Sequence, residues 1–277
     1  MALTYAVVAA VLLGASDFFA ARAARTTASI TVTRSAVAVS TALSPVLLLL
    51  VDSRWIARDV VIGVLSGLAM TTGLLLLYRG YSVARMGIVA PMSSVLLAAV
   101  PVVYDLLRGE RPSALGAVGM AVGLAALALT GYTPGGTGSV RLGAILGVSS
   151  GVAFGIAFTL MGEVSDDSGL APVVVQRFAG LAMLTVVGVL GSAPFFASER
   201  MARRSILATG TFAVFAIASL QLGFQEGSSG PVSVAASQFG TVAVILSVLF
   251  NRERMRWWQS VGLGAAAVGV ALMAAGG

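Results

Sequence analysis

The chain has 277 residues, of which 58% are hydrophobic and only 10% are charged, and it contains no cysteine and no histidine. Soluble domains are roughly 45 to 50% apolar and about 25% charged, so this composition excludes an ordinary soluble protein and favours a protein within a lipid bilayer. Without cysteine there are no disulfides or thiolate metal sites, and without histidine the commonest general base and metal ligand is missing. We therefore expect no enzyme activity, no metal and no cofactor.

Ten mainly apolar segments of about 20 residues follow one another along the chain, the length that crosses a hydrocarbon core of roughly 30 Å as a helix. The runs LLLLV and VAVILSVLF do not alternate apolar and polar residues, as strands of a membrane barrel would. The first segment has no basic start and carries Asp17, so we expect it to remain as a span rather than be cleaved. The expected spans are 3–21, 29–51, 59–78, 84–107, 113–132, 141–162, 172–196, 205–225, 230–250 and 256–276.

An internal repeat relates the two halves of the chain. A shift of 143 positions places Glu110 on Glu253 and Arg34 on Arg177, together with several glycines and Ser94 on Ser237. Before the second span the offset is 137, because the later half carries six extra residues around EVSDDSG. The sequence therefore predicts a first five-helix repeat at 1–132, a glycine-rich linker at 133–140 and a second repeat at 141–277.

Five spans are an odd number, so the second repeat enters the membrane in the opposite orientation to the first. The fold class predicted is an all-α membrane protein with ten transmembrane helices, arranged as two inverted five-helix repeats around a central cavity. Inverted repeats are typical of secondary transporters, whose substrate sites lie near the membrane midplane between the repeats.

The chain resembles the drug/metabolite transporter superfamily, and specifically its ten-helix EamA-like branch. The resemblance rests on the doubled five-helix repeat, on the arginine-phenylalanine pair Arg177 and Phe178, and on a fourth helix rich in small residues and proline, APMSSVLLAAVPVVYDLL. The connections RGERPSALG and NRERMRWWQ also fit. The first half departs from the pattern because Ser35 follows Arg34, and the ninth helix has Val244 where the fourth has Pro101.

This resemblance implies a bundle whose cavity is formed mainly by the first, third and fourth helices of each half and which moves small organic solutes. Many relatives export amino acids or other metabolites, and others carry sugars, nucleotide sugars or drugs. Family membership alone does not choose among these substrates.

Arg34 and Arg177 each lie about five residues inside an expected helix, or roughly 7 Å from its end. A long arginine side chain can return to the headgroups over that distance. Alternatively, each faces inward and pairs with a polar group or an anionic part of the substrate. Inverted repeats place them near opposite leaflets, so we do not expect them to meet.

Asp17 is one of few carboxylates more than a turn from any loop. It is either a helix-end acid paired with Arg22 or Arg25, or a coupling site for a proton or cation. The segment resembles the first helix of small multidrug resistance proteins, whose essential acid would align with Gly14, one turn before Asp17.

Other polar side chains in the third, fourth, eighth and ninth spans are candidates for lining a polar cavity. The predicted substrate-binding residues, besides the two arginines, are Tyr78, Ser93, Ser94, Gln221, Gln225, Ser237 and Gln238. A serine in a membrane helix often bonds its own backbone, whereas the glutamines, two of them spaced by four, have less reason to face lipid. Pro91 and Pro101 remove backbone hydrogen bonds within the fourth helix and are candidate hinges.

The 17 basic residues are all arginines and cluster at the ends of spans, which indicates topology signals and lipid headgroup contacts rather than nucleic acid. Ten spans place both termini on one side. Eleven arginines lie near the loops of the other side and four near the loops of the termini side, which favours external termini, although the family expectation is internal termini.

These features together predict a multi-pass secondary transporter of the plasma (inner) membrane that exports a small polar metabolite, such as an amino acid, by alternating access. The partners expected are the small-molecule substrate, protons as a candidate coupling ion and membrane lipids, with the protein a monomer or weak dimer. The alternatives are an uptake or exchange carrier for sugars, nucleotide sugars or drugs, and a lipid-linked flippase.

Overall fold

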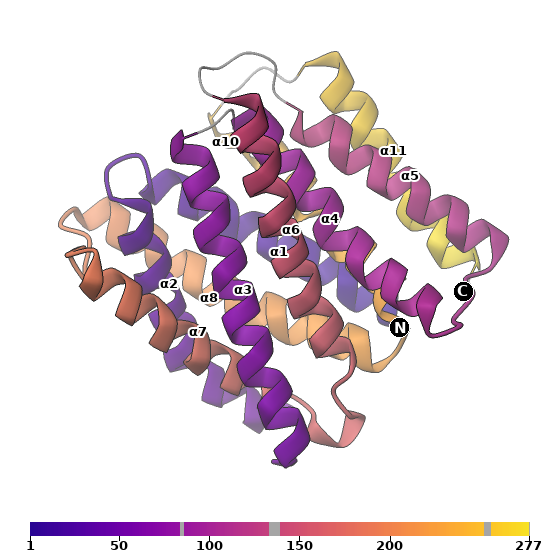
Figure 1. Cartoon of the computed structure of the whole chain (residues 1–277), viewed down its shortest axis with the longest axis horizontal. Coiled ribbons are helices and arrows are strands. Elements are labelled where there is room, and N and C mark those ends of the chain that lie inside the picture. The colour runs from indigo at the N-terminus through magenta and orange to yellow at the C-terminus, as the bar shows by residue number, and fades with distance from the viewer. Residues whose placement is uncertain (84–85, 133–138, 252–255, 277) are drawn as a thin grey trace.

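The computed structural model describes residues 1–83, 86–132, 139–251 and 256–276. Within these ranges the description does not cover the side chains of Tyr78, residues 81–83 and 86–88, Ala90, Pro91, Val244, Ser247 and Asn251. The described residues fold into helices joined by loops (Figure 1). The α-helices are α1 (Ala2–Ala23), α2 (Ser29–Leu43), α3 (Ala57–Val83), α4 (Met86–Leu107), α5 (Ala114–Gly131), α6 (Val140–Gly162), α7 (Ala171–Leu190), α8 (Arg200–Gln225), α9 (Ser229–Ala236), α10 (Phe239–Asn251) and α11 (Trp257–Gly276). Two 3-10 helices, η1 (Ser44–Leu49) and η2 (Asp166–Ser168), follow α2 and α6.

Within the described ranges, eight segments are long and apolar enough to cross a membrane. In two of them a span is built from two consecutive helices, α2 with η1 and α9 with α10. Two further apolar stretches, Met92–Leu107 in α4 and Ala114–Thr130 in α5, are shorter over the described residues. Together they describe a helical, multi-pass membrane protein.

The seventh span ends earlier than the sequence suggests. The predicted end is at residue 196, but α7 stops at Leu190, where Ser192 takes a positive φ of 51° and the Ala193 N–H bonds to the Gly188 carbonyl. Pro194 then prevents the helix from resuming. Phe195 and Phe196 therefore belong to a loop, and α8 begins at Arg200 rather than at 205.

The break in a membrane helix lies in the ninth span, not at the prolines of the fourth. α4 runs without interruption through Pro91 and Pro101, whereas α9 ends at Ala236 and α10 begins at Phe239. The amide of Gln238 fills this break by donating to the carbonyls of Gly123 and Val234, at 3.2 and 3.4 Å. The amide thus supplies a donor to the Val234 carbonyl beside the break and ties the span to α5, which makes the interruption tolerable at membrane depth.

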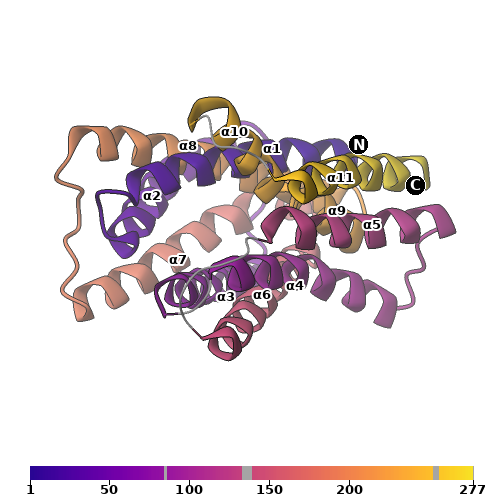
Figure 2. The same cartoon turned by 90° about the horizontal axis from the view of Figure 1, so that it is seen from above.

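The helices form two bundles and a peripheral pair. In the first bundle, α1 packs on α8, α9 and α10, and α2 packs on α8; in the second, α3 packs on α6 and α7, and α4 packs on α6. Figure 2 shows α8, α1 and α10 as one layer and α7, α3, α6 and α4 as the other. The bundles meet chiefly where α4 touches α9 and where α2 touches α7, and α5 pairs with α11 at the side.

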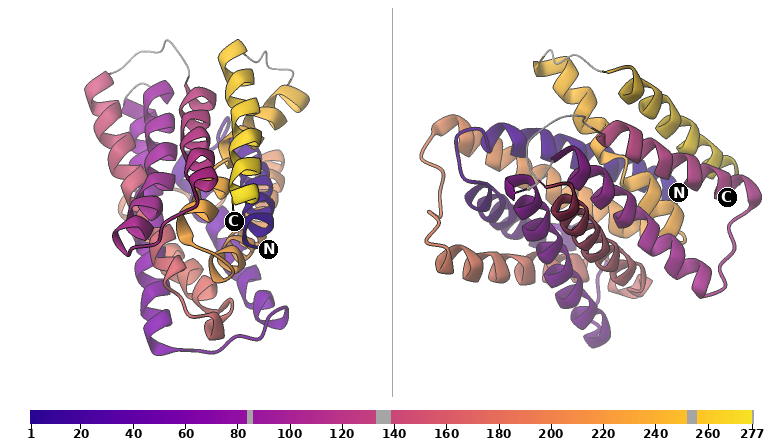
Figure 3. Two further views of the ribbon diagram at one scale, coloured as in Figure 1. Left: turned by 90° about the vertical axis from the view of Figure 1, so that its right-hand side faces the viewer. Right: turned by 45° about the horizontal axis from the view of Figure 1, so that its top comes forward.

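Both termini lie at the same end of the bundles (Figure 3). The N-terminal ammonium lies 3.8 Å from the Glu226 carboxylate, and the Ser113 hydroxyl donates to the Gly276 carbonyl at 2.6 Å. We call this end the termini face and the other end the opposite face. α1, α3, α5, α7 and α9 start at the termini face, α2, α4, α6, α8 and α11 run toward it, and α10 continues α9 toward the opposite face.

Candidate functional site

One stripe of α1 points into the molecule and changes from buried to exposed along its length. Ala6, Ala10, Leu13 and Asp17 are three or four residues apart and therefore share a face of the helix. Ala6 is 0% exposed and Ala10 4%, and Leu13 packs on the main core, but Asp17 is exposed. The valines that face outward, such as Val11, lie on another stripe. Asp17 is thus a carboxylate on the inward stripe of α1 whose side chain is exposed toward the opposite face.

The second bundle shows the same change along α3. Ile62 and Ser66 are 9% and 0% exposed near the termini face, whereas Met70, Leu74 and Leu77 on the same stripe are only half-buried. In α10, a side chain added at Gly240 would meet nothing within 4 Å. Among the described side chains, those of this stripe of α3 are therefore less fully buried toward the opposite face than toward the termini face.

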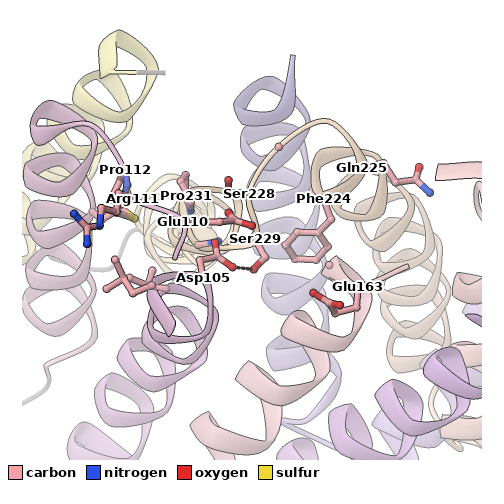
Figure 4. Close-up of a pocket in the computed structure, with 16 residues that line it drawn as sticks. Asp105, Glu110, Arg111, Pro112, Glu163, Phe224, Gln225, Ser228, Ser229 and Pro231 are labelled. Carbon is pink, nitrogen blue, oxygen red and sulfur yellow. Dashed lines mark hydrogen bonds between the residues drawn. The ribbon is translucent and has the colours of Figure 1, made fainter. Parts of the chain in front are cut away.

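On the termini face a buried carboxylate closes this interface. Asp105, at the end of α4, is 8% exposed and accepts hydrogen bonds from the Ser229 hydroxyl and the Gly230 N–H, both at 2.5 Å (Figure 4). Ser229 and Gly230 begin α9, so the negative charge lies where the unpaired N–H groups and the dipole of a helix favour it. This contact joins the second bundle to the first.

Two glutamines of α8 add to the closure. Gln221, 1% exposed, donates to the Met161 carbonyl at 3.3 Å, and Gln225 donates to the Gly169 carbonyl at 3.0 Å. Between them Phe224 packs edge-on against Phe158 of α6, with ring centroids 5.9 Å apart. The Gln221 carbonyl oxygen is buried without a hydrogen-bond partner among the described residues. The two glutamines predicted from the sequence therefore join α8 to the end of α6 and to the loop that follows it.

Outside this closure the termini face is hollowed into a cavity of about 480 Å³ between the ends of α4, α6 and α8 and the starts of α5 and α9 (Figure 4). Its polar lining contains three acids and one arginine and comes from Asp105, Glu110, Arg111, Glu163, Gln225, Ser228 and Ser229. Its apolar wall toward the core contains Val102, Met120 and Phe224. The cavity lies on the termini face, away from Asp17.

Ion pairs surround this cavity. Arg108 donates to the Tyr104 hydroxyl at 3.0 Å and to both Glu163 oxygens at 2.9 Å, and these contacts raise the pKa of Arg108. Arg58 lies 3.7 Å from Glu163. Both arginines are exposed and Glu163 is half-buried, and pairs with an exposed partner contribute little to stability, about 0 to 1 kcal/mol each. They act within the second bundle rather than across the interface.

A second buried carboxylate, Asp59 at the start of α3, holds the loop after α6. Its Oδ2 accepts bonds from the Ser165 N–H, the Ser165 hydroxyl and the Ser168 hydroxyl, the last at 2.6 Å. Asp59 is 1% exposed. The segment EVSDDSG, residues 163–169, therefore forms a loop that one buried acid fixes to α3.

Arg177 belongs to a hydrogen-bonded chain inside the second bundle. It is 8% exposed, and its guanidinium donates to the Gln176 side-chain oxygen at 2.6 Å. Gln176 donates to the Ser66 hydroxyl at 2.7 Å, which in turn donates to the Ala157 carbonyl at 2.9 Å. The Arg177 Nε is buried without a partner among the described residues. Arg177 thus faces the protein, not the headgroups.

Arg34 lies near the opposite face and has backbone partners. Its guanidinium is 1% exposed, donates to the Ala193 and Pro194 carbonyls at 3.0 and 2.6 Å, and lies 4.3 Å from the centre of the Phe195 ring. It occupies space that Gly188 leaves free. Arg34 therefore fastens α2 to the loop after α7. Among the described residues it shares no hydrogen-bond partner with Arg177 or with the glutamines of α8.

The remaining residues predicted to bind substrate or to act as hinges lie in α3, α4 and the segment between α9 and α10. The Ser93 and Ser150 hydroxyls lie 2.6 Å apart and join α4 to α6, and Ser94 is half-buried. Ser237 donates to the Val234 carbonyl one turn earlier, at 2.8 Å. Tyr78 lies in α3 and Pro91 in α4, but their side chains are outside the described part. Pro101 is buried in α4.

The structure adds residues that the sequence did not single out: Asp105, Ser229, Gln176, Ser66 and Asp59. A signal existed for Asp105, because it is the acid inside the fourth apolar segment, two residues before its end. Ser229 carried no signal, since its role depends on a residue more than a hundred positions away.

Asp17, on the other hand, makes no hydrogen bond or ion pair with any residue in the described ranges. Arg22, one expected partner, approaches the Met201 sulfur instead, at 4.0 Å. The carboxylate therefore stays available to water or to a ligand.

Comparison with known proteins agrees with this architecture. Residues 141–275 match the EamA-like transporter family. A crystal structure matches with a TM-score of 0.81 and 15% sequence identity, over 98% of this chain and 95% of that one, and at this identity the likeness concerns the fold alone. No curated protein matches the chain.

Proposed function

Residues 141–275 place the chain in the EamA-like transporter family of the drug/metabolite transporter superfamily, and we propose that the whole chain is a secondary transporter working by alternating access. The two bundles rock against each other, so that a path between them opens to one face at a time. The proposed cargo is a small polar metabolite such as an amino acid, exported across the plasma membrane.

The exposure of Asp17 carries this proposal. It lies on the inward stripe of α1 and is exposed, whereas Ala6 and Ala10, nearer the termini face, are buried on the same stripe. A path between the bundles that is open to one face and closed to the other accounts for this difference.

The proposed inverted repeat is supported by the packing. α1 packs on α8 as α6 packs on α3, and α2 packs on α8 as α7 packs on α3. In the proposed repeat, with α9 and α10 counted as one span, α1, α2 and α3 correspond to α6, α7 and α8. The contact of α1 with α8 then corresponds to that of α6 with α3, and the contact of α2 with α8 to that of α7 with α3. An inverted repeat allows the same interface to close at either face.

Asp17 is the proposed coupling site. A carboxylate without a salt-bridge partner, at membrane depth and reached by water from one face, is suited to load and release a proton. Arg177 and Gln221, each with a buried unpartnered atom, are the proposed polar groups that exchange partners when the bundles move.

The test is counterflow by the purified protein in liposomes, with radiolabelled amino acids, sugars, nucleotide sugars and a cationic drug supplied in separate assays. We expect one solute class to exchange in the parent and a pH gradient to drive its accumulation. Asp17→Asn should abolish the effect of the gradient, whereas Asp52→Asn, an exposed loop acid, should not. If no solute moves and a fluorescent lipid does, the chain is a flippase instead.

A further inference from the structure

A single buried acid joins the two bundles on the termini face. Asp105 belongs to α4 of the second bundle, and its partners Ser229 and Gly230 begin α9 of the first. The contact is close on all sides, since a Cβ added at Gly230 would lie 3.0 Å from the Asp105 Oδ2 and 3.2 Å from the Val102 Cα. Any motion that opens the interface at this face must separate Asp105 from α9.

The bonds of Asp105 differ from the other contacts around the cavity. Both donors are neutral and the acceptor is charged, which makes these hydrogen bonds stronger than neutral ones. Their carboxylate is buried, whereas the neighbouring acids Glu110 and Glu163 are more exposed or paired with arginine. Opening the interface would cost these bonds but would return the carboxylate to the water of the cavity. Such a contact can be broken and remade within a transport cycle.

From this geometry we propose that Asp105 is a gating residue: its carboxylate and the first turn of α9 form a latch that keeps the transport path closed at the termini face. The proposal rests on the proposed transport function, because it assumes that the bundles move apart. The latch sets the share of molecules open to each face. When it opens, the hydrogen bonds of Gln221 and Gln225 to the Met161 and Gly169 carbonyls break as well.

Cysteine labelling tests the latch, because the chain has no cysteine of its own. Ala6→Cys reports on the buried part of the inward stripe, and Ala21→Cys, four residues beyond Asp17 and exposed, reports on the opposite face. Each is measured in lipid nanodiscs with a polar maleimide, so both faces meet water and the orientation of the protein need not be known.

We expect Asp105→Asn and Ser229→Ala to accelerate labelling of Ala6→Cys by about tenfold, because losing a charge-assisted bond shifts an opening equilibrium by roughly that factor. Labelling of Ala21→Cys should stay near the parent rate, since most molecules remain open to the opposite face. General loosening of the fold would raise both rates.

Two matched controls share the cavity but not the latch. Ser228 lies beside Ser229 and its side chain makes no capping bond to α9, so Ser228→Ala should leave both rates unchanged. Glu110→Gln removes a neighbouring negative charge without touching α9, so it should keep the Ala6→Cys rate at or below the parent rate.

The latch is wrong if Asp105→Asn and Ser229→Ala label at the parent rate, or if Ser228→Ala matches Ser229→Ala. The same nanodisc measurement does not depend on substrate. A labelling change as expected, with no counterflow of any solute in liposomes, would instead reject the transport function and leave the moving interface in place.

Discussion

On the termini face, Asp105, Gln221 and Gln225 bond across the bundle interface, and the aromatic rings behind them are buried. On the opposite face, the described polar contacts lie at the edge, where Arg34 holds the loop after α7, and the centre leaves Asp17 exposed. Over the described residues, the same pair of bundles is thus closed at one end and more accessible at the other. Under the proposed transport function, this asymmetry makes the interface between the bundles the moving part.

Locking the closed end should have the largest effect. In the double variant Val102→Cys with Gly230→Cys, oxidation would join α4 to α9, because a Cβ at Gly230 lies 3.2 Å from the Val102 Cα. We expect counterflow to fall to the level of empty liposomes after oxidation and to return after reduction. Each single variant, treated in the same way, is the control. Full transport by a cross-linked protein would mean that the termini face does not open.

Changing the accessible end should have the next largest effect. Asp17→Asn keeps the size of the side chain but removes its charge, so we expect gradient-driven accumulation to fall by about tenfold or more, because the coupling proton can no longer bind. Asp17→Glu should restore a measurable part of it. Equal accumulation by the parent and Asp17→Asn would move the coupling site elsewhere.

Two glycines beside the contact of α1 with α10 distinguish tight packing from open space. A Cβ at Gly14 would lie 2.5 Å from the Val242 Cβ, so Gly14→Ala should destabilise the protein by about 1 to 3 kcal/mol. A Cβ at Gly240 meets nothing within 4 Å, so Gly240→Ala should cost nothing, as alanine is favoured in helices by about 1 kcal/mol. The midpoint of thermal unfolding in detergent measures both. Equal losses would show that the space at Gly240 is filled.

The edge contact on the opposite face should matter least. Arg34→Ala removes hydrogen bonds to two carbonyls, at a cost of about 1 to 2 kcal/mol, and should lower the unfolding midpoint while counterflow per folded molecule changes little. Arg22→Ala, an exposed arginine with one weak contact to a sulfur, should leave the midpoint unchanged. A loss of counterflow without a loss of stability would instead assign Arg34 to substrate.

Much of the architecture could be predicted because lipid restricts the choices. Long apolar runs must form helices at membrane depth, and this places α1, α6 and α11 within two residues of their predicted bounds at both ends. The end of α7 was wrong by six residues, because Phe195 and Phe196 read as membrane residues while Gly191 and Ser192 had already turned the chain.

The interruption of a membrane helix carried no proline signal. Pro91 and Pro101 stay candidate hinges within α4, which continues through both, whereas the observed interruption falls at Ser237 and Gln238 in a span without an internal proline near the break. Gln238 was predicted as a cavity residue from its polarity, but its amide bonds carbonyls on α5 and α9. The polarity of the glutamine predicted that it would not face lipid, but it did not predict which groups the amide would bind.

Hydrophobicity along the chain was enough to identify the membrane class and the rough positions of the spans. The match between its two halves led to the predicted relation between Arg34 and Arg177 and to the resemblance to a transporter family. Those properties are local or periodic, so they can be recognised without knowing which helices are neighbours. Three outcomes required the folded arrangement: Asp105 closes on α9, Asp17 stays exposed, and Arg34 is held by carbonyls. They depend on which helices lie side by side, since the partners of a buried charge come from distant segments that no local pattern identifies.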